Sequence, residues 1–302
     1  MGHMRHMRLH VDGTQLKNAA GDIVQLKGVS SSGLQWYPEY INKESFRTLR
    51  DDWKANVFRM AMYTAEGGFL DGADQEEQYK LIDEGVRITK ELGMYCLIDW
   101  HILSDYNPND HIEEAKVFFD RISKKYASEE HVIYEICNEP NQDVTWPEVK
   151  TYADVIIPVI RDNDKENVIL VGTPNWSQDV DFVAENPVND TKNVMYVCHF
   201  YAATHKEKLR AKVEKAIAEG TPVFISEFSI CDASGNGELD YDSAAEWVKL
   251  IEKYHLSFIG WNLSNRDESS AVLVPDCKKV FDWKEEDLNE SGIWLRNTLR
   301  AH

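Results

Sequence analysis

The sequence predicts an α/β protein with one architecture, a closed (β/α)8 or TIM barrel. Short apolar runs rich in β-branched residues alternate with longer stretches of helical apolar spacing, which is the pattern of parallel βα units. Eight of each occur in strict alternation, and eight is the number at which such units close into a barrel. A doubly wound open sheet would need a glycine-rich phosphate-binding turn after an early strand, and the sequence contains none.

The expected elements follow from this alternation. The strands are predicted at Val24–Ser30, Val57–Tyr63, Met94–Ile102, Val132–Glu139, Val168–Pro174, Val194–Tyr201, Val223–Ser229 and Leu256–Leu263. The helices are predicted at Lys43–Ala55, Ala73–Leu92, Ile112–Ala127, Trp146–Arg161, a short one near Gln178–Glu185, Lys206–Glu219, Asp240–Tyr254 and Glu286–Leu299. Gly93 and Gly220 stand where two helices should end, because glycine readily adopts the left-handed conformation of a helix C-terminus.

The N-terminal segment is expected to form a small β-hairpin that closes the bottom of the barrel. Between residues 8 and 25, Asp12-Gly13 and Gly21-Asp22 are turn signals flanked by strand-like residues. Residues 1–7 resemble a cloning remnant and are interpreted as a tail. Residues 8–302 show no repeat, low-complexity tract or linker, so we expect a single barrel domain there.

Charge and composition narrow the class of partner. The chain has 52 acidic and 33 basic residues and a net charge of −19, which disfavours binding to nucleic acid or to an anionic membrane. No apolar stretch approaches the roughly 20 residues that span a bilayer. Nine tryptophans and 13 tyrosines suit a soluble protein that acts on a neutral polymer.

The five cysteines do not form a disulfide framework, because their number is odd. Cys96, Cys137 and Cys198 lie in apolar runs, where cysteine usually behaves as a small buried hydrophobe. A bridge between Cys231 and Cys277, both in expected loops, stays open. The spacing of cysteine and histidine fits no zinc motif, so we expect no metal.

Two apolar strands each deliver a glutamate at their end. Glu139 follows the run from Val132 in an Asn-Glu-Pro sequence, and Glu227 lies near the end of the run from Val223. Carboxyl ends of barrel strands build the active site, so these side chains should meet. A glycosidase needs one acid to protonate a leaving oxygen and one carboxylate to attack or stabilise the sugar carbon. The pair therefore predicts glycoside hydrolysis.

Other polar and aromatic residues collect at the same strand ends, where a core cannot explain them: Arg59, His101, Asn138, Trp176, His199, Tyr201 and Trp261. Each has a structural alternative. Arg59 could pair with a buried carboxylate, expected to be Glu227. His101 could be a core histidine or form a metal pair with Asp99. Glu135, four residues before the end of its strand, is interpreted as a structural interior charge.

These residues resemble glycoside hydrolase family 5, in its bacterial endo-β-1,4-glucanase branch. The resemblance extends over roughly residues 24–294. It rests on the segments Gly33–Trp36, Phe58–Tyr63, Ile98–Asp105, Asn138–Pro140, Trp176–Asp179, His199–Tyr201, Ser226–Glu227, Asp232–Gly237, Trp261–Ser264 and Asp267–Ser270.

The resemblance implies a role for each residue of the central group. Glu139 would be the general acid/base and Glu227 the nucleophile, oriented by Arg59 and Tyr201, while Asn138 would bind the 2-hydroxyl of the sugar being cleaved. A guanidinium and a phenol hydroxyl beside Glu227 would favour its charged form, and burial would keep Glu139 protonated. We therefore expect a retaining double displacement, with the carboxyl groups about 5–5.5 Å apart.

The resemblance also implies the contacts along the sugar chain. The residues expected as platforms on the glycone side are Trp36, Tyr63 and Trp261, while His101 and His199 are expected to line the subsite of the sugar being cleaved. Trp176 is expected on the leaving-group side. Arg266 is expected to contact substrate at a position where the family commonly has lysine, and it replaces a point charge with a planar fork.

The sequence thus predicts a secreted, monomeric endo-β-1,4-glucanase that needs no cofactor and acts on cellulose-like or mixed-linkage β-glucans. The same fold and mechanism acting on mannan, xylan or xyloglucan is the nearest alternative. A catalytically silent carbohydrate-binding barrel and a metal-dependent barrel hydrolase are the more distant ones.

Overall fold

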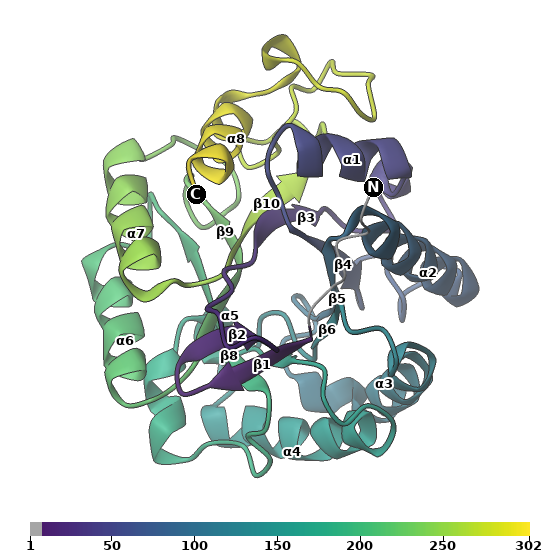
Figure 1. Cartoon of the computed structure of the whole chain (residues 1–302), viewed down its shortest axis with the longest axis vertical. Helices are drawn as coiled ribbons and strands as arrows, with labels where there is room; N and C mark the ends of the chain where they lie inside the picture. The colour runs from purple at the N-terminus through teal and green to yellow at the C-terminus, as the bar shows by residue number, and fades with distance from the viewer. Residues whose placement is uncertain (1–7) are drawn as a thin grey trace.

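A computed structural model describes residues 8–302, and within them eight parallel strands close into a barrel (Figure 1). The order around the barrel is β10-β3-β4-β5-β6-β7-β8-β9. These strands are β3 (Lys27–Ser31), β4 (Val57–Tyr63), β5 (Tyr95–His101), β6 (Val132–Glu135), β7 (Ile169–Val171), β8 (Val194–Tyr201), β9 (Val223–Ser229) and β10 (Phe258–Leu263). The predicted fold class is confirmed.

Helices surround the barrel and cover its outer face (Figure 1). The α-helices are α1 (Lys43–Asp51), α2 (Gln75–Leu92), α3 (Ile112–Tyr126), α4 (Trp146–Asn163), α5 (Pro174–Ser177), α6 (Glu207–Ala218), α7 (Tyr241–Tyr254) and α8 (Glu290–Ala301). Short 3₁₀ helices lie at η1 (Pro38–Tyr40), η2 (Pro108–His111), η3 (Val180–Glu185) and η4 (Glu285–Asp287). Gly93 ends α2 with φ of 71° and Gly220 follows α6 with φ of 87°, as predicted.

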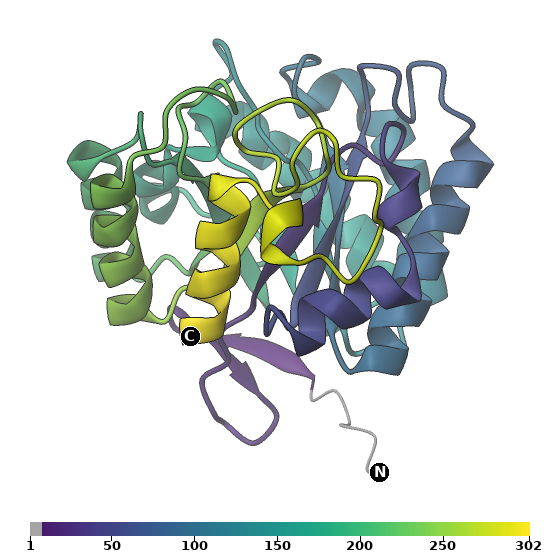
Figure 2. The same cartoon turned by 90° about the horizontal axis from the view of Figure 1, so that it is seen from above.

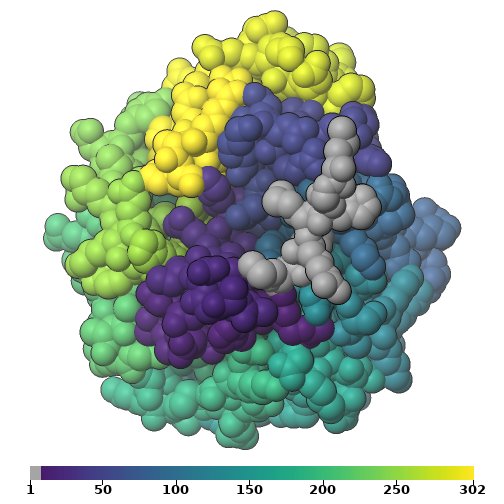
Figure 3. Space-filling view, viewed as in Figure 1, coloured from purple at the N-terminus to yellow at the C-terminus, as the bar shows by residue number. Residues whose placement is uncertain are grey.

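The predicted N-terminal hairpin is present. Strands β1 (Leu9–Asp12) and β2 (Gln15–Asn18) pair antiparallel. Leu9 and Leu16 are buried in one apolar cluster with Val57 of β4, which lies inside the barrel. The hairpin lies across one end of the barrel in Figure 2 and over the centre of the face shown in Figure 3. It therefore closes the end opposite the carboxyl ends of the strands.

The fourth and fifth strands are shorter than predicted. The run predicted at Val132–Glu139 leaves strand geometry after Glu135, and the run Val168–Pro174 is a strand only over Ile169–Val171. Here the backbones of the two segments approach so closely that a Cβ atom on Gly172 would lie 2.0 Å from the carbonyl oxygen of Cys137. The ends of both runs thus form irregular backbone that leads into the loops.

The helix predicted near Gln178–Glu185 is η3, and a left-handed turn precedes it. Asn175, Trp176 and Ser177 of α5 have φ of 58°, 57° and 56°. None is glycine, and the left-handed region costs other residues roughly 1–2 kcal/mol each. Hydrogen bonds hold this turn: the amide of Trp176 donates to the Pro140 carbonyl at 3.0 Å, and Oγ of Ser177 donates to the Asn138 carbonyl at 2.6 Å.

Two further expectations concern the chain as a whole. All five cysteines lie within residues 8–302 and carry free, buried thiols, so Cys231 and Cys277 are not bridged. Among the helices of those residues, none has the length and apolar character needed to cross a membrane. Residues 1–7, interpreted above as a tail, lie outside the described part of the chain.

Candidate active site

The inward faces of the barrel strands change from apolar to charged toward their carboxyl ends. Side chains alternate along a strand, so residues two apart face the same way. On β5, apolar Leu97 is followed on the same face by Asp99, and on β6 apolar Ile133 is followed by Glu135. Arg59 of β4 meets both carboxylates in the barrel interior, and all three charged side chains are fully buried.

Arg59 connects this buried layer to the cleft above it. Its Nη1 donates to Oε1 of Glu227 at 3.0 Å, and Nη2 donates to Oδ1 of Asn138 at 2.7 Å. Nη2 also lies 3.0 Å from Oδ2 of Asp99 and 2.5 Å from Oε1 of Glu135. The predicted ion pair between Arg59 and Glu227 is present. Arg59 also pairs with the buried carboxylates of Asp99 and Glu135, which is the structural role given above as the alternative.

The carboxylate of Glu227 has a hydrogen-bond donor on each oxygen. Arg59 binds Oε1, and the hydroxyl of Tyr201 donates to Oε2 at 2.7 Å. A register shift between β8 and β9 after Val197 places His199 directly opposite Glu227. Both donors stabilise negative charge on this carboxylate and fix its orientation.

Glu139 lies in a different environment. Its Oε1 is 2.8 Å from Nδ1 of His199, whose Nε2 is 2.8 Å from Oγ of Ser226. Burial, followed by the nearby charge of Glu227, raises the pKa of Glu139 well above its usual value. Burial also lowers the pKa of His199 well below its usual value, so its ring is neutral. The two glutamates therefore lie in different electrostatic environments, and that of Glu139 raises its pKa.

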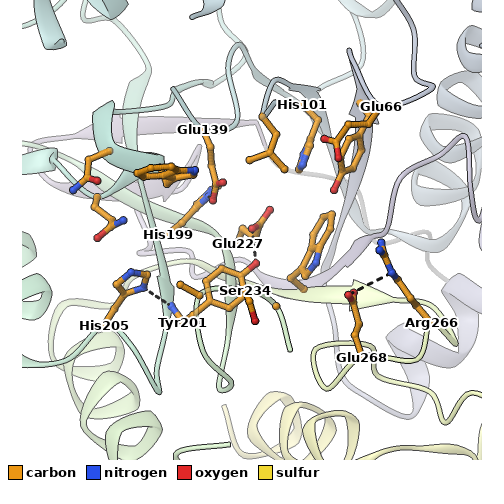
Figure 4. A pocket seen from close by; sticks show the side chains of 18 of the residues that line it. Glu66, His101, Glu139, His199, Tyr201, His205, Glu227, Ser234, Arg266 and Glu268 are labelled. Carbon is orange, nitrogen blue, oxygen red and sulfur yellow. Dashed lines mark hydrogen bonds and ion pairs between the residues drawn. The ribbon is translucent and has the colours of Figure 1, made fainter. Parts of the chain in front are cut away.

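The two carboxyl groups face one cavity, as Figure 4 shows. One oxygen of Glu139, one of Glu227 and a ring nitrogen of His199 all lie within 4.8 Å of one another. Three such donors could surround a cation. However, Arg59 and Tyr201 already bind Glu227, and His199 already contacts Glu139, so protein groups satisfy these atoms. The absence of a metal stays a prediction.

Around this pair lies a cleft of about 720 Å³. On the His101 side, the ring of Tyr63 lies 4.1 Å from that of His101 and 4.8 Å from that of Trp36, centre to centre. The ring of Trp261 lies 5.4 Å from that of His101 and nearly parallel to it. Trp176 also lines the cleft and is 38% exposed. Flat apolar rings of this kind suit the faces of sugar rings.

Arg266 extends the aromatic wall. Its guanidinium carbon lies 5.6 Å from the centre of the Trp36 ring, and its Nε lies 3.4 Å from Oε2 of Glu268 (Figure 4). This geometry allows a cation–π contact and leaves half of the Arg266 side chain exposed. The guanidinium of Arg266 thus lies at the edge of the cleft, beside the ring of Trp36.

The cleft brings together ten of the twelve predicted site residues, namely Trp36, Tyr63, His101, Glu139, Trp176, His199, Tyr201, Glu227, Trp261 and Arg266. Arg59 and Asn138 lie beneath it. Oδ1 of Asn138 accepts from Arg59, and its Nδ2 donates to the Ile102 carbonyl at 3.0 Å. Contact between Asn138 and a sugar hydroxyl stays a prediction.

Sequence reasoning missed several residues that line the cleft: Glu66, Leu103, Asn175, Gln178, His205, Ala233, Ser234, Gly235 and Glu268. All of them lie in the segments that follow strands, with Asn175 in the short helix α5, and this position is the signal that could have found them. His205 also accepts a 2.8 Å hydrogen bond from the amide of Tyr201, so it supports the segment that carries that phenol.

A (β/α)8 barrel with two facing carboxyl groups in a ring-walled cleft defines a glycoside hydrolase. Sequence comparison agrees: the family described as cellulase (glycosyl hydrolase family 5) matches residues 17–267. The chain belongs to this family.

Relatives of known sequence and structure are similar over nearly the whole chain. Endoglucanase A of Butyrivibrio fibrisolvens is 47% identical over 95% of this chain and 67% of its own length. An endoglucanase of Clostridium saccharobutylicum is 44% identical over 97% of this chain and 65% of its own length. The chain thus spans about two thirds of the length of these relatives.

Solved structures superpose closely. The cellulase Cel5C_n has a TM-score of 0.94 at 41% identity, covering 97% of this chain and 92% of its own. The catalytic domain of Thermobifida fusca endoglucanase Cel5A, solved in complex with cellotetraose, has a TM-score of 0.91 at 35% identity and covers 98% of each chain.

Proposed function

We propose that this chain is an endo-acting β-1,4-glucanase that cleaves internal bonds of cellulose-like or mixed-linkage β-glucans with retention of configuration. The observation that carries the proposal is the approach of Glu139 and Glu227, whose oxygens come within 4.8 Å. Retaining glycosidases separate their carboxyl groups by about 5–5.5 Å, whereas inverting ones need about 6.5–9.5 Å to admit a water molecule. The short separation supports a double displacement.

In the first step, the Glu227 carboxylate attacks the anomeric carbon while protonated Glu139 transfers its proton to the departing glycosidic oxygen. The products are a covalent glycosyl ester on Glu227 and a free sugar chain with a new hydroxyl. Ester formation removes the charge of Glu227, which raises the pKa of Glu139 when present. Glu139 therefore becomes more acidic, stays ionised and accepts a proton from the water that cleaves the ester.

Arg59 and Tyr201 would hold Glu227 for attack, and neutral His199 would orient Glu139. Asn138 would contact the 2-hydroxyl, with Trp36, Tyr63, His101, Trp261 and Arg266 on the glycone side and Trp176 under the leaving group. The named endoglucanase relatives and the cellotetraose complex support a β-glucan oligosaccharide or polysaccharide as substrate. We further propose a secreted, monomeric enzyme that needs no metal or cofactor, in a single catalytic domain.

The test of mechanism is proton NMR of the anomeric hydrogen during early hydrolysis of a β-glucan oligosaccharide. We expect the β-anomer to appear first, and an initial α-anomer would overturn the double displacement. Glu227→Ala should abolish turnover yet still bind oligosaccharide. Unchanged turnover would remove Glu227 from its role.

The test of substrate is a rate comparison on carboxymethyl cellulose, barley β-glucan, mannan, xylan and xyloglucan. We expect the first two to be cut fastest, with a rapid fall in viscosity that marks internal cleavage. Preference for any of the others would reassign the substrate within the same mechanism. Full activity in EDTA is expected, and its loss would indicate a metal-dependent reaction.

A further inference from the structure

We infer that Asp99 and Glu135 form a second carboxyl pair beneath the active site and hold one proton between them. In that state the pair carries a single negative charge against Arg59. The role of this charge in the reaction rests on the proposed function of Glu227, whereas the existence of the shared proton does not.

The geometry places the two carboxyl groups against each other. Asp99 of β5 and Glu135 of β6 are register partners on adjacent parallel strands, and both side chains are fully buried. Both contact the same nitrogen of Arg59, Nη2, at 3.0 Å for Oδ2 of Asp99 and 2.5 Å for Oε1 of Glu135. Two groups that bind one nitrogen from neighbouring strands lie side by side.

The second oxygen of each carboxyl group has no hydrogen-bond donor, and one shared proton would supply it. Oδ1 of Asp99 and Oε2 of Glu135 are buried, and no donor within residues 8–302 hydrogen-bonds to either. Two ionised carboxylates cannot bond each other, because both only accept. Burying an unsatisfied polar atom is costly, so two such atoms side by side are unfavourable. One proton between Glu135 and Asp99 makes each oxygen the partner of the other.

The charges around the pair favour the same state. Within residues 8–302, Arg59 is the one cation in contact, and it faces Asp99, Glu135 and Glu227 together. Burial raises the pKa of Asp99 to about 7 and that of Glu135 to about 8, although Arg59 opposes both shifts, so the pair keeps one proton and one negative charge between these two pH values. The charge of Asp99 also raises the pKa of Glu135.

The remaining neighbours add no positive charge. Burial holds the pKa of His101, which contacts Oδ2 of Asp99 at 2.5 Å, to about 3, and His199 is also neutral. The charges of Asp99 and Glu135 also raise the pKa of Glu139. The Ser226 hydroxyl favours ionised Glu135 but carries no charge. With one proton on the pair, Arg59 is shared between one buried negative charge and Glu227. Asp99 and Glu135 are therefore positioning residues.

Infrared difference spectroscopy tests the shared proton directly. The Glu139→Gln variant removes the acid proton of Glu139, and at pH 7.5, between the pKa values of Asp99 and Glu135, we expect its spectrum to keep a protonated carboxyl band. The band should be lost in Glu135→Gln/Glu139→Gln and in Asp99→Asn/Glu139→Gln, because each new amide donates to the remaining carboxylate. Glu66→Gln/Glu139→Gln, altered at an exposed glutamate that lines the cleft, should keep it. Absence of the band in Glu139→Gln, or its persistence when Glu135 is replaced, would overturn the proposal.

Thermal unfolding gives a second readout on folded variants. A single amide substitution, Glu135→Gln or Asp99→Asn, keeps one donor and one acceptor in the pair, so Tm should change by less than about 2 °C. The double substitution brings two amides together and removes the last charge, and Tm should fall by more than about 6 °C. Additive effects of the two substitutions would contradict a shared proton. Neither measurement depends on turnover, so loss of the proposed function would leave them unaffected.

Discussion

The hydroxyl of Tyr201 donates a 2.7 Å hydrogen bond to Oε2 of Glu227, on the carboxylate oxygen that Arg59 leaves free. Tyr201 is at the end of β8 and Glu227 is in β9, and these neighbouring strands bring the two side chains together. The phenol is buried, so its bond to a charged acceptor is little weakened by water.

Tyr201→Phe should therefore lower kcat by roughly 10- to 100-fold, because a hydrogen bond to a charged group contributes about 1.5–3 kcal/mol. The effect should fall on kcat more than on KM, as measured by initial rates on a soluble β-glucan. Tyr241→Phe is the matched control, since Tyr241 is exposed and its hydroxyl contacts Glu290 away from the cleft. Equal losses in both variants would show that the Tyr201 hydroxyl has no specific part.

The raised pKa of Glu139 predicts an alkaline limit to activity. Burial and the charge of Glu227 keep Glu139 protonated above the ordinary glutamate value, and the acid is lost as pH rises through this raised pKa. We expect kcat/KM on β-glucan to fall as pH rises through this pKa, which gives the pH profile an alkaline limb. Glu139→Ala should still form the glycosyl ester from an aryl glycoside with an activated leaving group, and that step should lack the limb. An unchanged limb in this variant would assign it to another group.

Trp176 should act on the leaving-group side alone. Trp176→Ala should raise KM for cello-oligosaccharides by about 2- to 10-fold, in line with the roughly 0.5–1.5 kcal/mol of a ring contact. Rates on a short aryl glycoside should change little. Phe182→Ala is the control, because Phe182 is also an exposed ring but does not line the cleft. Equal effects on both substrates would contradict the assigned side.

Gly172 is required by the close approach of two strand ends. An added Cβ would lie 2.0 Å from the Cys137 carbonyl oxygen, two residues before Glu139. Gly172→Ala should destabilise the fold by more than about 2 kcal/mol and reduce activity. Gly67→Ala, with φ of 77° and open space around its Cβ, should cost only about 1 kcal/mol. Urea unfolding compares the two, and similar values would refute the clash.

The buried carboxyl pair predicts how stability depends on pH. The folded pKa values of Asp99 and Glu135, about 7 and about 8, exceed those of the unfolded chain, about 4. The folded state thus binds more protons between these values, and its stability falls as pH rises from about 4 to about 8, by up to about 1.4 kcal/mol per pH unit for each extra proton. Glu135→Gln should flatten this slope in urea unfolding across pH. Parallel curves for the two proteins would contradict the linkage.

Much of this site could be predicted from the sequence, because parallel strands in a barrel bring their carboxyl ends to one face. That rule alone placed Glu139, Glu227 and Tyr201 together, and the pairing of Arg59 with Glu227 followed from charge. The joint contact of Asp99 and Glu135 with one nitrogen could not be predicted, because it depends on strand register and on how far each side chain reaches.

The left-handed turn could not be predicted either. Sequence rules expect glycine where φ is positive, and residues 175–177 are Asn, Trp and Ser. The hydrogen bonds that hold the turn come from a neighbouring loop, which local propensity does not describe.

That turn has a consequence for engineering. Trp176 and Ser177 donate to the carbonyls of Pro140 and Asn138, which flank Glu139 on either side. Replacing this turn would change which sugar binds on the leaving-group side of the cleaved bond. The same replacement would also alter the backbone that carries Glu139. Libraries that vary residues 175–177 should therefore couple changes in product profile to changes in pH optimum, and the most useful variants should carry compensating substitutions in both segments.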